Sequence, residues 1–195
     1  MRKTVSADCS LLNSGTLRAD RLYEPGFLSV GDLNDINPYH KAVDLVEVTG
    51  EDLISLLEEG VSAAPALEGR FPMVSNIEFE YDPTKPPFHR VDAKTIKVAG
   101  LPLIKSMKYR IASSFYLTSG KDGYETFKKS KPLLDIANAT ALGDMVMAFF
   151  DLADSRKFRE EYKVYQQNQE IVSKNFIRER VKMKVEQDAY VKGNS

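Results

Sequence analysis

The sequence has only one cysteine, Cys9, so an intramolecular disulfide is impossible and a fold held together by disulfides is excluded. A lone cysteine in an apolar run is more often a small core residue than a nucleophile. No stretch approaches the ~20 apolar residues that span a bilayer, and the N-terminus has no apolar leader. No membrane span is therefore expected, and the default expectation for location is the cytoplasm.

Histidine is also scarce, with only His40 and His89. A two-metal phosphatase centre needs several Asp, His and Asn ligands close together, and neither histidine lies in such a cluster. Walker, Gly-x-Gly-x-x-Gly and Gly-x-Ser-x-Gly patterns are absent as well. We therefore predict no metal ligand, no cofactor and no catalytic residue in this chain.

The chain carries no excess of either charge: 27 Lys and Arg face 28 Asp and Glu, giving a net charge of -1. A dedicated nucleic-acid-binding protein usually has a large basic excess. No nucleic acid is expected as a partner.

Proline and glycine divide the chain into two parts. Residues 1–150 hold all nine prolines and ten of the 11 glycines, and residues 151–195 form a charged extension without proline. Strand patterns over 9–12, 42–48, 77–81, 96–98 and 109–116 occur with helix patterns after Thr49 and over 142–150. Neighbouring strands are not regularly separated by helices, so we predict a mixed α/β (α+β type) domain over 1–150, followed by a long helical extension over 151–195.

The extension has apolar residues at helical spacing, namely Phe158, Tyr162, Tyr165, Val172 and Phe176. Two interpretations fit this stripe: the extension packs on its own domain, or the extension forms a coiled-coil contact with another chain.

Three loop segments hold side chains suited to a nucleoside. Asn13 and Arg18 follow the first strand; an amide suits the edge of a heterocycle, and a guanidinium suits phosphate or sugar oxygens. Tyr39 and Tyr116 could stack on a flat base, and Asp122 could accept hydrogen bonds from ribose hydroxyls. Each residue also has an ordinary structural interpretation: a core or rim aromatic, a surface ion-pair partner or a turn former. Spacing alone does not bring the segments together.

Five strings in order make residues 5 to 150 resemble the C-terminal domain of the 5'-nucleotidase family: residues 7–18, 37–39, 46–53, 69–75 and 116–124. The resemblance implies α/β/β/α layers with mixed sheets and a pocket that binds a nucleotide or nucleoside such as AMP. The family's aromatic base clamp matches Tyr39 and Tyr116, with Tyr39 often a Phe in relatives. Its asparagine, arginine and ribose-binding aspartate match Asn13, Arg18 and Asp122.

The resemblance also implies a function for the chain. Family members carry two divalent metals in an N-terminal metallophosphoesterase domain that has no counterpart in this sequence. The expected function is therefore substrate recognition for a phosphoric ester hydrolase in nucleotide catabolism, inactive alone, with a separate metallophosphoesterase domain as a candidate partner. The alternative is a non-enzymatic interaction protein that keeps the fold and binds another chain through its helical tail.

Overall fold

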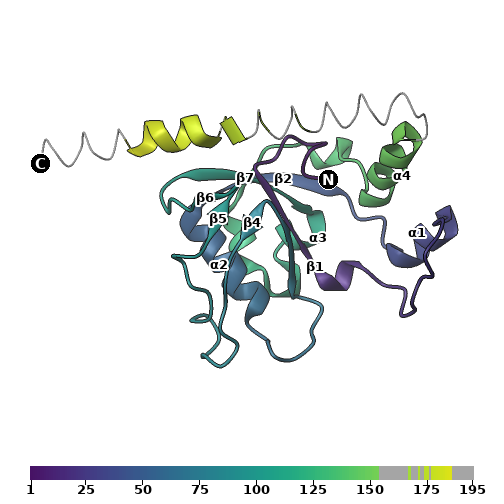
Figure 1. The fold of residues 1–195 in the computed structure, drawn as a ribbon, viewed down its shortest axis with the longest axis horizontal. Helices are drawn as coiled ribbons and strands as arrows, with labels where there is room; N and C mark the ends of the chain where they lie inside the picture. The colour runs from purple at the N-terminus through teal and green to yellow at the C-terminus, as the bar shows by residue number, and fades with distance from the viewer. Residues whose placement is uncertain (154–166, 168–170, 172–173, 176, 186–195) are drawn as a thin grey trace, which may run out of the picture.

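The computed structural model describes residues 1–153, 167, 171, 174–175 and 177–185. The main sheet has five strands in the order β3-β1-β7-β2-β8, and Figure 1 labels β1, β7 and β2 among them. The neighbours β1 and β7 run parallel, and the other neighbours run antiparallel. This mixed sheet confirms the predicted fold class. Its strands are β1 (Cys9–Asn13), β2 (Val43–Thr49), β3 (Pro72–Ser75), β7 (Lys108–Ser114) and β8 (Lys131–Pro132).

A smaller antiparallel sheet and several helices surround the main sheet. The small sheet consists of β4 (Ile77–Glu78), β5 (Lys97–Val98) and β6 (Leu101–Pro102), in that order. The α-helices are α1 (Val30–Ile36), α2 (Gly50–Val61), α3 (Phe115–Thr118) and α4 (Leu142–Ala153). Short 3-10 turns cover Ser14–Thr16, Lys121–Gly123, Glu125–Lys129 and Ile136–Asn138.

The start of α2 follows the predicted capping pattern. The Thr49 side chain accepts from the Asp52 N–H, and the Asp52 carboxylate accepts from the Thr49 N–H, so two free donors at the helix start are satisfied. Leu53, Leu56 and Leu57 then recur on one face and are fully buried. The local pattern thus sets both where this helix begins and which face it buries.

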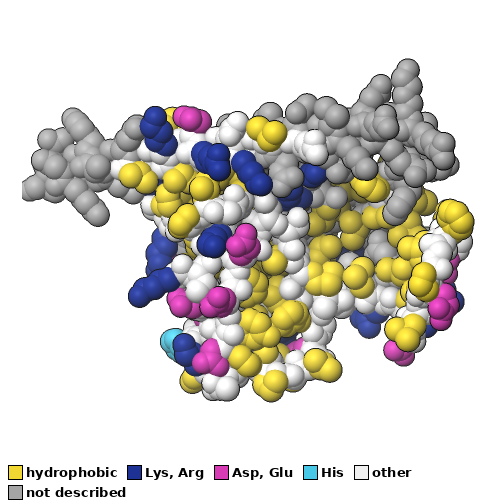
Figure 2. Space-filling model, in the orientation of Figure 1, with side chains coloured by type: hydrophobic (Ala, Val, Ile, Leu, Met, Phe, Trp, Pro, Cys, Tyr) yellow, Lys and Arg dark blue, Asp and Glu magenta, His cyan; other side chains and the backbone are white. Residues whose placement is uncertain are grey.

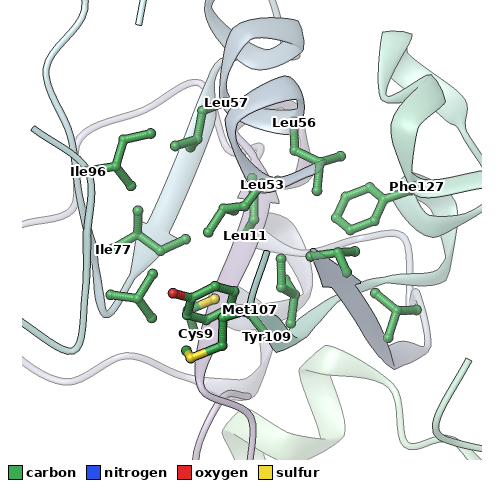
Figure 3. Close-up of a cluster of buried hydrophobic side chains, with 14 of the residues drawn as sticks. Cys9, Leu11, Leu53, Leu56, Leu57, Ile77, Ile96, Met107, Tyr109 and Phe127 are labelled. Atoms are coloured by element: carbon green, nitrogen blue, oxygen red, sulfur yellow. The ribbon is translucent and has the colours of Figure 1, made fainter. Parts of the chain in front are cut away.

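The core lies between α2, one face of the main sheet and the small sheet (Figure 3). Cys9 and Leu11 of β1 point into it, and Ile77 and Val98 enter from the small sheet. Cys9 is fully buried, and burial raises the pKa of its thiol, so it is the core residue that the sequence indicated.

Two predicted strands end earlier in the structure than the sequence pattern indicated. The strand expected over 77–81 ends at Glu78, because the Glu80 N–H donates to the Thr95 hydroxyl instead of to a neighbouring strand. The strand expected to reach Tyr116 ends at Ser114, whose side chain accepts from the Leu117 N–H and begins α3. Side chains in both places compete with the sheet for backbone donors.

Residues 177–185, the longest described run of the C-terminal helix, pack against the domain, and Figure 2 shows Lys and Arg side chains along it. Ile177 is buried in the core. Asp8, at the start of β1, accepts from Arg110 at 3.0 Å and from Arg180 at 2.9 Å, and Arg180 also donates to the Lys108 carbonyl. Of the two interpretations of the extension, packing on its own domain therefore applies to residues 177–185. The predicted stripe of Phe158, Tyr162, Tyr165, Val172 and Phe176 lies outside the described residues, and the division at residue 150 stays a prediction.

Candidate functional site

The five residues expected at the site line one pocket of about 440 Å³. They come from the end of β1 and the turn after it, the segment before β2, α3 and the loop after α3. Three further residues complete the lining. The full set is Asn13, Gly15, Arg18, Tyr39, Lys41, Gly69, Tyr116 and Asp122.

Asn13 holds two parts of the pocket together. It is only 3% exposed; its amide nitrogen donates to the Asp122 carboxylate at 2.7 Å, and its amide oxygen accepts from the Thr16 hydroxyl at 2.6 Å. These bonds fix the amide, which retains one N–H and one lone pair for a ligand. Asn13 therefore orients Asp122 as well as facing the pocket.

The turn after β1 approaches another backbone closely. The Gly15 N–H donates to the Gly69 carbonyl at 2.8 Å, and a Cβ on Gly15 would lie 3.1 Å from the Gly69 Cα. A side chain at either position would push these backbones apart. The two glycines thereby allow this close backbone contact within the pocket lining.

Backbone hydrogen bonds connect the remaining segments. The Arg18 N–H donates to the Ile36 carbonyl at the end of α1, and the Phe115 N–H donates to the Ala42 carbonyl just before β2. The first bond places Arg18 near Tyr39, with its guanidinium carbon 5.5 Å from the ring centroid. The second places α3, and with it Tyr116, beside the segment that carries Tyr39.

Asp122 lies in a loop of left-handed backbone. Its φ is 59°, and Gly120 and Gly123 on either side have φ values of 80° and 83°. Aspartate tolerates this conformation better than most residues, because its short side chain can hydrogen-bond locally. The loop turns the carboxylate toward Asn13 and the pocket.

The two tyrosine rings remain accessible: Tyr39 is 47% exposed and Tyr116 is 36% exposed. Between them lies Lys41, whose Nζ is 4.8 Å from the Tyr39 ring centroid and 3.8 Å from the Tyr116 ring centroid. Burial lowers the pKa of Lys41, and Arg18 adds to the lowering while Asp122 opposes it.

Sequence reasoning missed Lys41. It matches no motif, and its only indication was its position two residues after Tyr39.

Sequence reasoning also predicted no helix at α1, although Ser29 and Asp32 have the spacing of Thr49 and Asp52 and form the same reciprocal cap. That spacing could have predicted α1 and thereby the position of the segment that carries Tyr39.

The described residues offer no group of three or more His, Cys, Asp or Glu side chains that could hold a metal ion. Two divalent metals therefore do not fit the residues of this pocket, whose donor set is one carboxylate, one amide and two cations. What the pocket can offer to a ligand is ring faces, hydrogen bonds and positive charge.

None of the helices within the described ranges is both long and apolar enough to cross a bilayer.

Comparison with known proteins identifies what the chain is similar to. A family model described as "5'-nucleotidase, C-terminal domain" matches residues 1–129. The trifunctional nucleotide phosphoesterase protein YfkN of Bacillus subtilis is 26% identical over 132 residues, which are 66% of this chain and 9% of that protein. The NAD 5'-nucleotidase of Haemophilus influenzae is 27% identical over 137 residues, covering 65% of this chain and 22% of that protein.

Solved structures show the same fold. The 5'-nucleotidase precursor of Thermus thermophilus superposes with a TM-score of 0.61 at 23% identity, covering 73% of this chain and 27% of that one. The NAD nucleotidase of Haemophilus influenzae gives a TM-score of 0.55 at 25% identity, covering 63% and 22%. This chain thus spans at most about a quarter of these relatives.

Proposed function

Because this chain belongs to the family of 5'-nucleotidase C-terminal domains, we propose that it is the substrate-recognition domain of a 5'-nucleotidase-type phosphoric ester hydrolase in nucleotide catabolism. One observation carries the proposal. Asn13, Arg18, Tyr39, Tyr116 and Asp122 come from separate segments and line a single pocket. Family membership favours this function over a non-enzymatic interaction protein.

The pocket's chemistry fits each part of a nucleotide. A base stacks on the faces of Tyr39 and Tyr116, and such stacking contributes about 1–3 kcal/mol per base. Asp122, already held by Asn13, accepts hydrogen bonds from the ribose hydroxyls. Arg18 offers two parallel N–H groups that suit phosphate oxygens.

Hydrolysis requires residues beyond this pocket. A pair of divalent metals would polarise the phosphoryl group and generate the attacking hydroxide, and the described residues contain no group that could hold them. The proposed chain therefore binds and orients the substrate, and a metallophosphoesterase domain supplies the metal centre. That domain is the proposed partner.

Isothermal titration tests the proposal with AMP, adenosine and a UDP-sugar. We expect binding at millimolar affinity or tighter, and at least about fivefold weaker binding by Tyr116→Ala, because one stacking face is lost. Phe27→Ala is the matched control, since Phe27 is a fully exposed aromatic outside the pocket lining. Absence of binding by the wild-type chain up to about 10 mM ligand, which corresponds to a binding free energy near -3 kcal/mol, would refute the proposal.

A further inference from the structure

Lys41 lies in the space where a stacked base would be placed. Its Nζ is 3.8 Å from the centroid of the Tyr116 ring, and a base stacked on that ring would lie at about 3.5–4 Å, the van der Waals separation. The ammonium group therefore occupies the same layer as the base. A nucleoside that enters the pocket must move the ammonium sideways or meet it with the edge of its ring.

Hydrogen bonds hold the backbone at Lys41 and at Ala42, so the main chain that carries the ammonium group is attached to α3 and α4. The Lys41 carbonyl accepts from the Leu142 N–H at 3.0 Å, and the Ala42 carbonyl accepts from the Phe115 N–H at 2.9 Å. Only the four-carbon side chain can swing, and it stays within reach of the base layer.

We propose that Lys41 determines base specificity, and that it makes the pocket prefer bases with a carbonyl oxygen at the edge far from the ribose over bases with an amino group there. This inference rests on the proposed function. It names hypoxanthine-like and uracil-like bases as the preferred class, and adenine-like and cytosine-like bases as the disfavoured class.

The chemistry of the two edges supports this preference. An ammonium group has three donors and no acceptor, and the lone pairs of a base carbonyl lie in the plane of the ring, where the Lys41 ammonium lies. An exocyclic amino group at the same position would place its own N–H donors against the N–H donors of the ammonium group. The base carbonyl thus gains a charge-assisted hydrogen bond that the amino group cannot form.

The surroundings of Lys41 leave its donors available. The carboxylate whose charge acts on Lys41 is that of Asp122, and it already accepts from the Asn13 amide at 2.7 Å. Burial lowers the pKa of Lys41, which reflects hydration lost by the ammonium group. A carbonyl acceptor on the base would replace part of that hydration.

Two pairs of nucleosides test the inference, because each pair exchanges a carbonyl for an amino group at the far edge: inosine with adenosine, and uridine with cytidine. Isothermal titration of the wild-type chain should show about tenfold tighter binding of the carbonyl member in each pair. This ratio corresponds to the lower end of the range for a hydrogen bond to a charged group, because the pocket is half open. Lys41→Met keeps much of the length of the side chain and removes the charge, so both ratios should fall to about one.

Lys94→Met is the control, because Lys94 is exposed and lies outside the pocket lining, and it should keep the wild-type ratios. Equal binding of the members of each pair by the wild type, or ratios unchanged in Lys41→Met, would overturn the role of Lys41 and leave the proposed function standing if Tyr116→Ala still weakens binding. Failure of all four nucleosides to bind would overturn this inference, and the proposed function would fall with it only if AMP and the UDP-sugar also failed to bind.

Discussion

The hydrogen bond between Asn13 and Asp122 connects residues 109 positions apart and should contribute measurably to stability. A hydrogen bond to a charged group contributes about 1.5–3 kcal/mol, and the lower value applies because Asp122 is partly exposed. Asn13→Ala also removes the acceptor of the fully buried Thr16 hydroxyl, which adds about 1 kcal/mol. We expect Asn13→Ala to lower the free energy of unfolding by about 2.5 kcal/mol.

A double-mutant cycle isolates the contact itself. Urea denaturation of the wild type, Asn13→Ala, Asp122→Ala and the double variant should give a coupling energy of about 1.5 kcal/mol. Alanine at a φ of 59° is strained, but this strain occurs in both proteins that lack Asp122 and cancels in the cycle. A coupling energy below about 0.5 kcal/mol would show that the two side chains do not support each other, and the assigned role of Asn13 would be wrong.

Two further changes test the packing and the electrostatics. Gly50→Ala should lower the free energy of unfolding in a urea titration by about 2–3 kcal/mol, because its Cβ would lie 2.3 Å from the Ile104 carbonyl oxygen. Gly31→Ala is the control, because its Cβ would meet only the Ser29 hydroxyl at 3.4 Å. In the same titration it should be neutral or stabilising by up to about 0.5 kcal/mol. Burial raises the pKa of Glu59, although Thr126 donates to its carboxylate. The protonated form therefore stabilises the fold at low pH, and this contribution is lost as the pH rises through the folded-state pKa. Urea titrations should accordingly show that the stability of Glu59→Gln relative to the wild type increases from about pH 4 to about pH 7, and a difference independent of pH would contradict the assignment.

Local patterns were sufficient to predict several elements. The apolar stretch over 42–48 predicts β2, and the Thr49–Asp52 spacing predicts the start of α2, because both depend on neighbours within a few residues. The family resemblance selected the five site residues, and the structure brings them into one pocket. That they bind substrate stays a prediction.

Contacts between distant segments could not be predicted in this way. No periodicity indicates that Arg110 and Arg180 both reach Asp8, since these contacts arise only when β1, β7 and the C-terminal helix are assembled. Lys41 was missed for the same reason: its position between Tyr39 and Tyr116 depends on hydrogen bonds that join its segment to α3 and α4. Pattern-based reasoning sees a residue's neighbours in the chain and not its neighbours in space.

The order of strands in the main sheet has a consequence for how the chain folds during synthesis. β1 is made first, yet its partners β3 and β7 lie far downstream, and Cys9 pairs with Ile111. Pairing of such distant segments requires closure of long loops and is slow. β1 therefore stays unpaired on the ribosome, with its backbone N–H groups exposed, until most of the domain has emerged. During this interval the nascent chain is most prone to aggregate or to bind chaperones.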